Sequence, residues 1–363
     1  MKIGPMFLIC MLLTGACATV GEPFDEKAWR SRVDGSDTKL LYAPHYRDGK
    51  YFNPWLPSEN RGFGAFLKWR LFGKEAEYTD QELAYLPPVV PEAAKRAAAM
   101  KDQDRDYILW VGHATFLIRI DGEYWITDPV FSDQIVILRR KTPPALTASD
   151  LRGLGGPINV ILSHNHYDHL DEDSIRQMPR GTRFYVPLGL GGLVRELHGG
   201  EVIEMDWWQE TVSAKGSRII CLPMQHWSRR ITQGTNSNLW ASFMILARKT
   251  SVYFAGDSGY FTGYREIGRR FPGIGYALMP TTAYRPRWFM HYSHMDVRES
   301  LNAFRDLGAR HFIPTQWGTF HLGEEPPGYP GLDLRREIER QKLDASSYII
   351  MDIGGIVEIG QKR

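Results

Sequence analysis

Three histidines and an aspartate fall within six consecutive residues near the middle of the chain: His164, His166, Asp168 and His169. Where a chain leaves a strand in extended form, alternate side chains project to the same side, so His164 and His166 can share one metal ion. Asp168 and His169 follow as the chain turns into a helix, and they project differently, toward a second ion. Imidazole and carboxylate ligands at this spacing suit zinc or a similar divalent cation.

Two further ligand candidates stand where strands are expected to end. His226 follows the β-rich run 219–224, and Asp257 follows the run 251–255. Gly256 precedes Asp257, and a glycine there lets the backbone approach a metal closely. A lone histidine or aspartate is normally an ordinary polar residue. Here a ligand-type residue follows a predicted strand several times, and this repetition favours a functional interpretation.

From residue 107 onward, the segments that are expected to position these residues alternate regularly between strands and helices. Short β-rich runs occur in two batches, and each batch is followed by helical segments. The strands expected in the first batch are 107–111, 115–120, 124–127, 159–162 and 182–186; those in the second are 218–222, 241–246, 251–255 and 312–314. A helix is expected over 297–307, and terminal strands over 348–352 and 357–359. Two batches of this kind indicate an α/β fold in which two sheets pack face to face with helices outside.

Composition narrows the function classes. The chain has 363 residues, of which 43% are hydrophobic and 24% charged, as expected for a globular protein with a large core. The net charge is only +2, and the basic residues are scattered, which argues against a nucleic-acid partner. Eleven tryptophans and seventeen tyrosines indicate large apolar contacts, either within the core or with a lipid-like ligand or membrane interface.

The first eighteen residues have the pattern of a signal peptide. Lys2 precedes an apolar run, residues 6–13, that is too short to span a bilayer, and small residues follow it. The cleavage signal is either of the lipoprotein type, with lipidation at Cys17, or an ordinary signal-peptidase site. Either route predicts a location in the bacterial cell envelope, lipid-anchored to the membrane or periplasmic. Cys221 is then a lone thiol, and no disulfide framework is expected.

The remainder divides into an arm and a main domain. Residues 19–105 are predicted to form an N-terminal arm packed on the catalytic domain, with a short helix over 63–72. Residues 106–363 are predicted to form that domain.

Several separate motifs resemble a known family. The metal-ligand pattern resembles the metallo-β-lactamase superfamily, and more specifically the N-acyl-phosphatidylethanolamine-hydrolysing phospholipase D proteins and their bacterial relatives. The similarity covers roughly residues 45–325, and its motifs are the metal run itself with residues 110–115, 127–132 and 286–290. The resemblance implies a four-layer αβ/βα sandwich with the site at one edge, two zinc ions and frequent homodimers.

The resemblance also implies a distribution of ligands. One zinc takes His164, His166 and His226, the second takes Asp168 and His169, and Asp257 bridges the two. The family usually has a further histidine ligand before Trp-Gly-Thr-Phe, and this chain has Gln316 there. A glutamine coordinates only through its neutral carbonyl oxygen, a weaker zinc donor than imidazole. Three possibilities therefore remain open: Gln316 is a weak ligand, His321 replaces it, or neither residue binds the metal. Occupancy of the second metal site is less secure than that of the first.

Supporting roles are expected for several other residues. Asp128 either orients a ligating histidine through its second ring nitrogen or caps a turn at the end of a strand. His294 is expected to hold the phosphate or assist proton transfer. The alternative for this segment is a helix N-cap, which would more naturally fall to Ser293 or Asp296. The substrate contacts expected from the same comparison are Tyr167, Arg285, Arg287 and Trp288; arginines packed on core aromatics would give the same pattern for the last three.

The function implied is a zinc-dependent hydrolase that uses metal-bound hydroxide on N-acyl phosphatidylethanolamine-like lipids, with peripheral membrane association. In-line attack at phosphorus would release phosphatidic acid, with Asp168 or Asp257 positioning the water. One rival is another hydrolase of the same fold, acting on a lactone or other ester or phosphoester. A second rival is a metal-binding envelope protein without turnover, for which only Gln316 argues.

Overall fold

The computed structural model describes residues 24–58, 64, 69 and 76–360. The expected signal peptide with Cys17, and nearly all of the helix expected over 63–72, lie outside the described residues. They stay predictions.

The first sheet has seven strands in the order β10-β9-β8-β5-β4-β3-β19. The chain enters through an antiparallel meander of β3, β4 and β5, and β8, β9 and β10 then add in parallel to β5. The C-terminal β19 closes the opposite edge by pairing antiparallel with β3. The bounds are Tyr107–Gly112 (β3), Thr115–Ile120 (β4), Glu123–Thr127 (β5), Ile158–Ile161 (β8), Arg183–Pro187 (β9), Glu201–Met205 (β10) and Ile356–Glu358 (β19).

The second sheet has six strands in the order β11-β12-β15-β16-β17-β18. Its first four strands pair antiparallel, and β17 and β18 add in parallel to β16. The bounds are Glu210–Val212 (β11), Arg218–Leu222 (β12), Ser242–Leu246 (β15), Ser251–Phe254 (β16), Tyr276–Pro280 (β17) and His311–Thr315 (β18).

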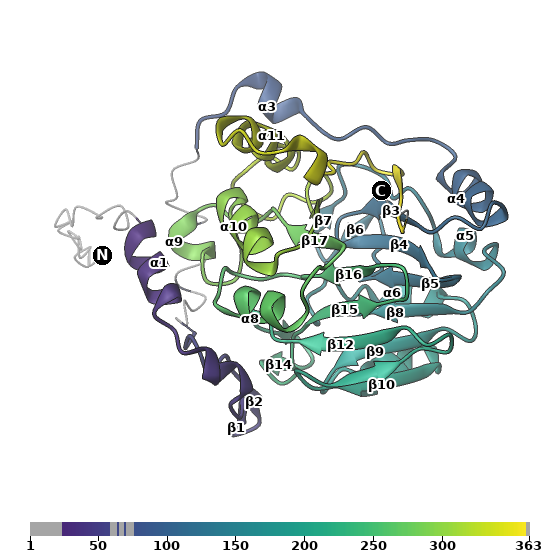
Figure 1. Cartoon of the computed structure of the whole chain (residues 1–363), viewed down its shortest axis with the longest axis horizontal. Coiled ribbons are helices and arrows are strands. Elements are labelled where there is room, and N and C mark those ends of the chain that lie inside the picture. Colours follow the sequence, from purple (N-terminus) through teal and green to yellow (C-terminus); the bar gives the residue numbers. More distant parts are fainter. Residues whose placement is uncertain (1–23, 59–63, 65–68, 70–75, 361–363) are drawn as a thin grey trace, which may run out of the picture.

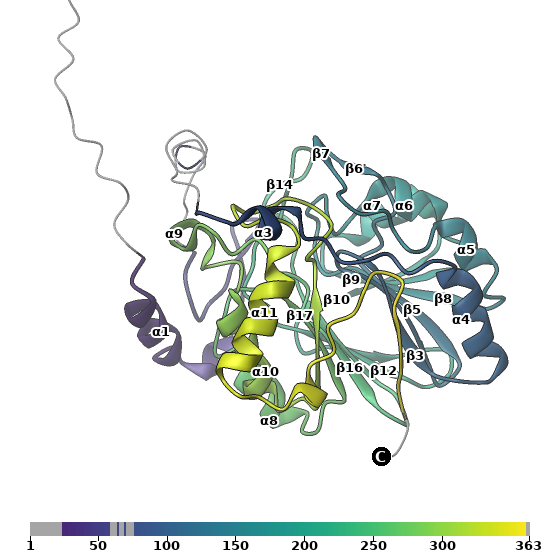
Figure 2. The same cartoon turned by 90° about the horizontal axis from the view of Figure 1, so that it is seen from above.

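Helices cover the outer faces of both sheets (Figures 1 and 2). Those on the first sheet are α4 (Ala93–Asp102), α5 (Ala148–Arg152), α6 (Glu172–Gln177) and α7 (Gly191–His198). Those on the second are α8 (Gly263–Arg270), α10 (Val297–Leu307) and α11 (Tyr329–Arg340). The peripheral elements are α1 (Glu26–Asp34), η1 (Thr38–Tyr42), β1 (Tyr46–Arg47), β2 (Lys50–Tyr51), α3 (Asp80–Ala84), β6 (Gln134–Ile135), β7 (Leu138–Arg139), β13 (Arg229–Arg230), β14 (Gly234–Thr235), α9 (Arg287–Met290) and η2 (Ala345–Ser347).

Alternation along β3 shows how the layers arise. Ile108 and Trp110 belong to the apolar cluster between the two sheets, whereas Leu109 and Val111 belong to the cluster under the helices. Since successive side chains of a strand point to opposite faces, a strand that is apolar at every position must be covered on both sides. The predicted four-layer αβ/βα sandwich is therefore confirmed.

The N-terminal segment contributes to the main core. Trp29 on α1 and Trp55 after β2 are 4% and 3% exposed, and both join the larger apolar cluster, which also includes residues of the second sheet, α8 and α10. Trp55 lies 5.1 Å from Trp207 and 5.3 Å from Phe261 between ring centroids, and its Nε1 donates to Gln225 Oε1 at 2.6 Å. The segment is thus part of the packed structure and leads to the loop that carries His226.

The strand expected over 348–352 does not form. Tyr348 makes only an isolated bridge to Phe312, and the Ile349 N–H donates to the Phe312 carbonyl at 2.8 Å. The Ile353 N–H then donates to Pro88 at 3.0 Å, a different partner. Because this segment crosses from the second sheet to the first, no single neighbour supplies a continuous ladder.

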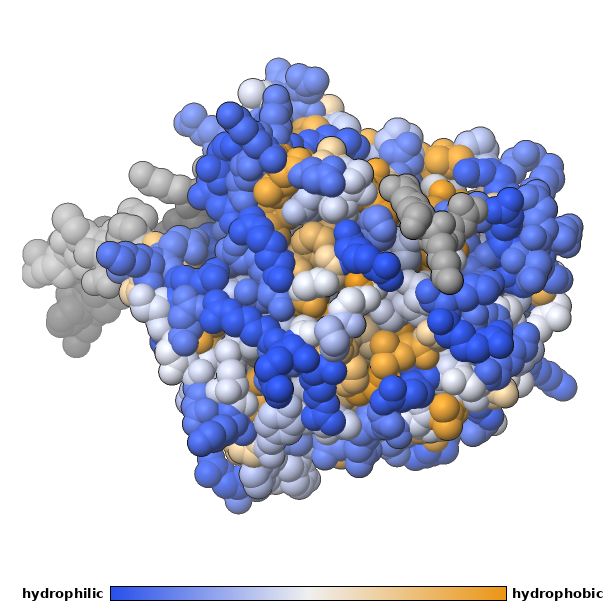
Figure 3. All heavy atoms as spheres, viewed as in Figure 1, coloured by the Kyte–Doolittle hydropathy of each residue, from blue (hydrophilic) through white to orange (hydrophobic). Residues whose placement is uncertain are grey.

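The surface shows small apolar areas separated by hydrophilic residues on the face drawn in Figure 3. Within the part of the chain that the structure describes, no helix has both the length and the hydropathy needed to cross a bilayer.

We expect Trp55→Ala to lower the free energy of unfolding by about 3–5 kcal/mol, because it removes a buried aromatic ring and its hydrogen bond. Urea denaturation checks this. The control is Tyr46→Ala on the same segment, whose side chain is 57% exposed and should change stability by under about 0.5 kcal/mol. Equal, small effects of the two variants would contradict a core role for this segment.

Candidate metal centre

The polar residues of the site lie on loops that follow successive strands. The ligand run 164–169 follows β8, His226 follows β12, Asp257 follows β16, and Gln316 follows β18. His113 in the β3–β4 turn, Asp128 after β5 and Gln316 have φ of +50°, +30° and +74°. Left-handed backbone at residues other than glycine is uncommon, and it clusters at functional sites.

The first donor group is formed by three imidazoles. The Nε2 atoms of His164 and His226 lie 2.8 and 3.2 Å from Nδ1 of His166. Nδ1 of His226 faces the Ser293 carbonyl at 3.1 Å, so that nitrogen carries the proton. The Ser163 hydroxyl donates to Asp128, and it therefore accepts from Nδ1 of His164 at 2.9 Å. The lone pairs of both Nε2 atoms consequently point at His166.

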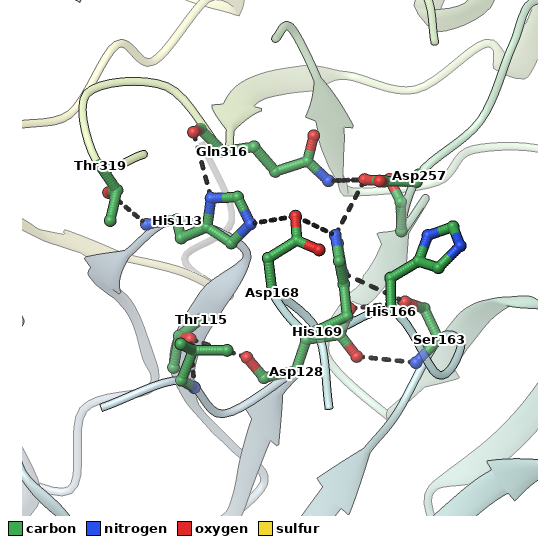
Figure 4. Close-up of polar contacts among 12 residues, drawn as sticks. His113, Thr115, Asp128, Ser163, His166, Asp168, His169, Asp257, Gln316 and Thr319 are labelled. Atoms are coloured by element: carbon green, nitrogen blue, oxygen red, sulfur yellow. Dashed lines mark hydrogen bonds and ion pairs between the residues drawn. The ribbon is translucent and has the colours of Figure 1, made fainter. Parts of the chain in front are cut away.

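The second donor group lies beside the first and contains Asp168 and His169 (Figure 4). Nε2 of His169 lies 3.5 Å from Asp168 Oδ2 and 3.1 Å from Asp257 Oδ1. The other oxygen of Asp257 lies 4.0 Å from His164 Nε2 and 3.9 Å from His226 Nε2. Asp257 therefore lies between both groups, where the resemblance implies a bridging ligand.

These residues fit a metal ion on the geometry of the donors. One proton on His166 Nδ1 can satisfy only one of the two lone pairs that face it, whereas a cation can satisfy all three nitrogens. His169 Nε2 is buried and faces the carboxylate oxygens of Asp257 at 3.1 Å and Asp168 at 3.5 Å in a geometry that makes no hydrogen bond among the described residues. Leaving buried polar atoms unpaired costs about 1–3 kcal/mol each. A metal bound by the two groups removes that cost.

Burial and charge set the ionisation of the site. Burial lowers the pKa of His164 and His226 well below the usual value, and it lowers the pKa of His166 to about 4. These imidazoles are thus neutral, as metal ligands must be. Burial acts in the same direction on His169, but the carboxylates of Asp257, Asp168 and Asp128 outweigh it and raise its pKa.

Asp128 has the orienting role that the sequence left open. Its carboxylate accepts from the Ser163 backbone N–H at 2.7 Å and from the Ser163 hydroxyl at 2.6 Å. It also accepts from Nδ1 of His169 at 2.6 Å, which directs Nε2 of that ring toward Asp257 (Figure 4). Carboxylate partners of this kind fix the ring orientation of metal-ligating histidines.

Gln316 lies at the site, and His321 lies outside the donor groups. The amide Nε2 of Gln316 donates to Asp257 Oδ1 and approaches the Gly256 carbonyl at 3.4 Å. Its Oε1 is buried and has no hydrogen-bond partner among the described residues. The structure therefore presents the donor end of this amide to the carboxylate. His321 is exposed, and it belongs to none of the groups of ligand types found in the described residues.

His294 lies at the edge of the donor groups. Its Nδ1 is 4.0 Å from Asp257 Oδ2, and its ring centroid is 5.3 Å from that of His226. The N-cap of α10 is Asp296, which forms a capping box with Glu299. Asp296 is therefore the residue that caps the helix, and the His294 ring is free of that role and can act at the site.

Of the four substrate residues expected from the sequence, Tyr167 lies in the ligand run, and the other three lie on or beside α9. The Arg230 guanidinium lies 4.1 Å over the Tyr167 ring. Arg287 donates to Glu299 at 2.7 Å, to Glu26 at 3.1 Å and to the His294 carbonyl at 3.1 Å. Its guanidinium therefore supports the His294 segment. Arg285 lies 5.7 Å over Tyr78 and Tyr329, and the Trp288 ring lies 5.6 Å from Phe289.

Sequence reasoning missed His113 as a site residue. It is fully buried, and its Nε2 lies 3.1 Å from Asp168 Oδ2 (Figure 4). The available signal was its position in the turn between two predicted strands, within a motif that had been used only for the resemblance.

Comparison with known proteins agrees with this arrangement. Residues 124–317 match the Beta-lactamase superfamily domain. The N-acyl-phosphatidylethanolamine-hydrolyzing phospholipase D 1 of Caenorhabditis elegans is 30% identical over 275 residues, which cover 70% of this chain and 76% of that protein. A metal-dependent hydrolase of Hyperthermus butylicus is 28% identical and covers 67% of this chain and 96% of its own length.

Among solved structures, a metallo hydrolase from the archaeon Ignicoccus hospitalis superposes with a TM-score of 0.55 at 20% identity. The match covers 71% of this chain and 99% of that chain. The chain therefore belongs to the metallo-β-lactamase superfamily. It is a metal-dependent hydrolase of that superfamily, and its His and Asp groups fit metal binding.

We expect Asp128→Asn to weaken metal binding by about 10–100-fold, because an amide cannot accept all three hydrogen bonds and its own N–H₂ faces a donor. Competition with a chelator measures this affinity. Asp173→Asn on α6, whose carboxylate is 72% exposed, is the control and should leave affinity unchanged. Unaltered affinity in the Asp128 variant would show that the ring of His169 does not need this partner.

Proposed function

We propose that the protein binds two zinc ions and is a phosphodiesterase of the phospholipase D type, acting on N-acyl phosphatidylethanolamine-like lipids. The observation that carries this proposal is the pair of donor groups joined by Asp257. The choice of lipid is supported by the similarity over 275 residues to a phospholipase D that is named for this substrate.

The ligands and the catalytic side chains have separable tasks. When bound, divalent ions lower the pKa of a coordinated water to about 7 and neutralise charge on phosphoryl oxygens. Asp168 and Asp257 accept hydrogen bonds from the attacking water and orient it toward phosphorus. Nδ1 of His294 lies 4.0 Å from Asp257 Oδ2 and makes no hydrogen bond within the described part of the chain, so the ring can hold a phosphate oxygen or pass a proton to the leaving group.

Exposed aliphatic side chains on two hairpins support access from a lipid surface. Ile137 at the tip of β6–β7 is 83% exposed, and Ile231 at the tip of β13–β14 is 88% exposed. The Ile231 N–H donates to the Tyr167 hydroxyl at 3.2 Å, whereas β6–β7 joins the loop after Gln316 through the Lys141 N–H and the Thr319 carbonyl at 2.8 Å. The two hairpins therefore flank the donor groups, and β6, β7 and β14 lie along one edge in Figure 2.

Basic residues accompany these tips. Arg139, Lys141 and Arg229 are all exposed. Apolar tips with adjacent cations suit a bilayer surface that carries anionic headgroups.

Purified protein loaded with zinc should release phosphatidic acid from N-acyl phosphatidylethanolamine in vesicles, as measured by mass spectrometry of the lipid products. Lactones and soluble phosphodiesters are assayed in parallel. Turnover of a lactone with no release of phosphatidic acid would replace this proposal by the rival ester hydrolase, and no turnover of any of these would favour a protein that only binds metal.

His166→Ala and Asp257→Ala should each reduce turnover by at least about 10³-fold while the circular dichroism spectrum stays unchanged. His166→Ala removes the imidazole that faces both His164 and His226, and Asp257→Ala removes the carboxylate between the two donor groups. The matched control is His198→Gln on α7, whose ring bonds the Met178 carbonyl away from the site. Activity near wild type in either site variant would contradict the assignment of the site.

Ile137→Ser combined with Ile231→Ser should weaken binding to anionic phospholipid vesicles by at least about 10-fold, since each buried aliphatic side chain contributes about 1.5–3 kcal/mol. Vesicle co-sedimentation measures this. Val212→Ser on β11, a side chain that is 58% exposed, is the control. Unchanged sedimentation of the double variant would show that the two hairpin tips do not bind the lipid surface.

A further inference from the structure

We propose that His113 is a direct ligand of the metal ion held by Asp168 and His169. One ligand atom from each of these three residues lies within 4.8 Å of the others, so they form a donor group of their own. The inference rests on metal binding at the second donor group, and it is independent of the lipid substrate proposed above.

The protons of the His113 ring identify which atom is the donor. Nδ1 lies 3.2 Å from the Gln316 carbonyl oxygen, and Nε2 lies 3.1 Å from Asp168 Oδ2. A carbonyl oxygen only accepts, so Nδ1 carries a proton, and Nε2 is the nitrogen that can give a lone pair to a cation shared with Asp168.

The same arrangement occurs at His226. Its Nδ1 donates to the Ser293 carbonyl, and its Nε2 faces the first donor group. A backbone carbonyl on the second ring nitrogen is the usual partner of a metal-ligating histidine.

The distances within the group match a single coordination sphere. Two donors that are each about 2.0–2.2 Å from a tetrahedral zinc ion lie about 3.3–3.6 Å apart. Asp168 Oδ2 lies 3.1 Å from His113 Nε2 and 3.5 Å from His169 Nε2. His169 Nε2 in turn lies 3.1 Å from Asp257 Oδ1. Each of these separations is within a few tenths of an ångström of that edge length.

Gln316 explains why this chain would use His113. The Gln316 amide presents its N–H₂ to Asp257, so it adds no donor atom to the group in this orientation. Its backbone, however, fixes His113: the Gln316 N–H donates to the His113 carbonyl at 3.0 Å, and the His113 N–H donates to Thr319 Oγ1 at 2.9 Å. The ring is thereby held in place, and its imidazole supplies a nitrogen where Gln316 supplies none.

Metal binding without substrate tests this assignment. Zinc per chain is measured by mass spectrometry after dialysis against a weak chelator, for wild type, His113→Phe and His113→Phe combined with Gln316→His. We expect two ions in the wild type, loss of one in His113→Phe with at least about 100-fold weaker affinity for it, and restoration in the double variant. The ion held by His164, His166 and His226 is retained throughout and serves as the internal control for folding.

Two results would overturn the assignment. Wild-type affinity for both ions in His113→Phe would show that the ring is not a ligand. Loss of one ion that Gln316→His does not restore would show that His113 acts only by positioning Asp168. A measurement on the wild type decides the case if the variants do not fold: with a spin-½ cadmium isotope in both sites, Nε2 of His113 should show scalar coupling to the metal, and absence of that coupling refutes the proposal.

Discussion

The constraint on which the site depends is the convergence of imidazole nitrogens and carboxylates in a buried place with too few protons to pair all of them. His164, His166 and His226 present more acceptors to one point than protons can satisfy. Asp257 joins this group to His169, and burial keeps the first three rings neutral. Such a set is costly for a folded protein unless a cation occupies it, so metal binding and stability of this edge are linked.

The sandwich supplies the rigidity that this convergence needs. Both sheets are covered on their outer faces by helices, and the loops that carry ligands leave from strand ends of both sheets. The backbone at His113, Asp128 and Gln316 takes left-handed φ values, which the surrounding hydrogen bonds hold in place. Asp128 shows the principle best, because one buried carboxylate fixes both the start of the ligand run and the ring of His169.

The sequence predicted the parts of the site that are local or periodic. The ligand run, His226 and Asp257 follow strands whose alternation can be read directly, and the helix over 297–307 was predicted with its observed bounds. What it could not predict depends on contacts between distant segments. His113 becomes a site residue only because β3–β4 packs beside the loops of Asp168 and Gln316. Residues 348–352 form no strand because the chain bonds β18 at Ile349 and then moves to the Pro88 loop at Ile353. The role of Arg287 was uncertain for the same reason, since Glu26 and Glu299 pair with it across 261 and 12 residues of sequence.

The most direct test of a two-ion centre shared by Asp257 is anomalous diffraction at the zinc edge from crystals of zinc-loaded protein. Two peaks about 3.5–4 Å apart are expected, one among His164, His166 and His226 and one beside Asp168 and His169, with the Asp257 carboxylate between them. A single peak with Asp257 turned away from it, or no peak in fully loaded crystals, would contradict a two-ion centre shared by Asp257.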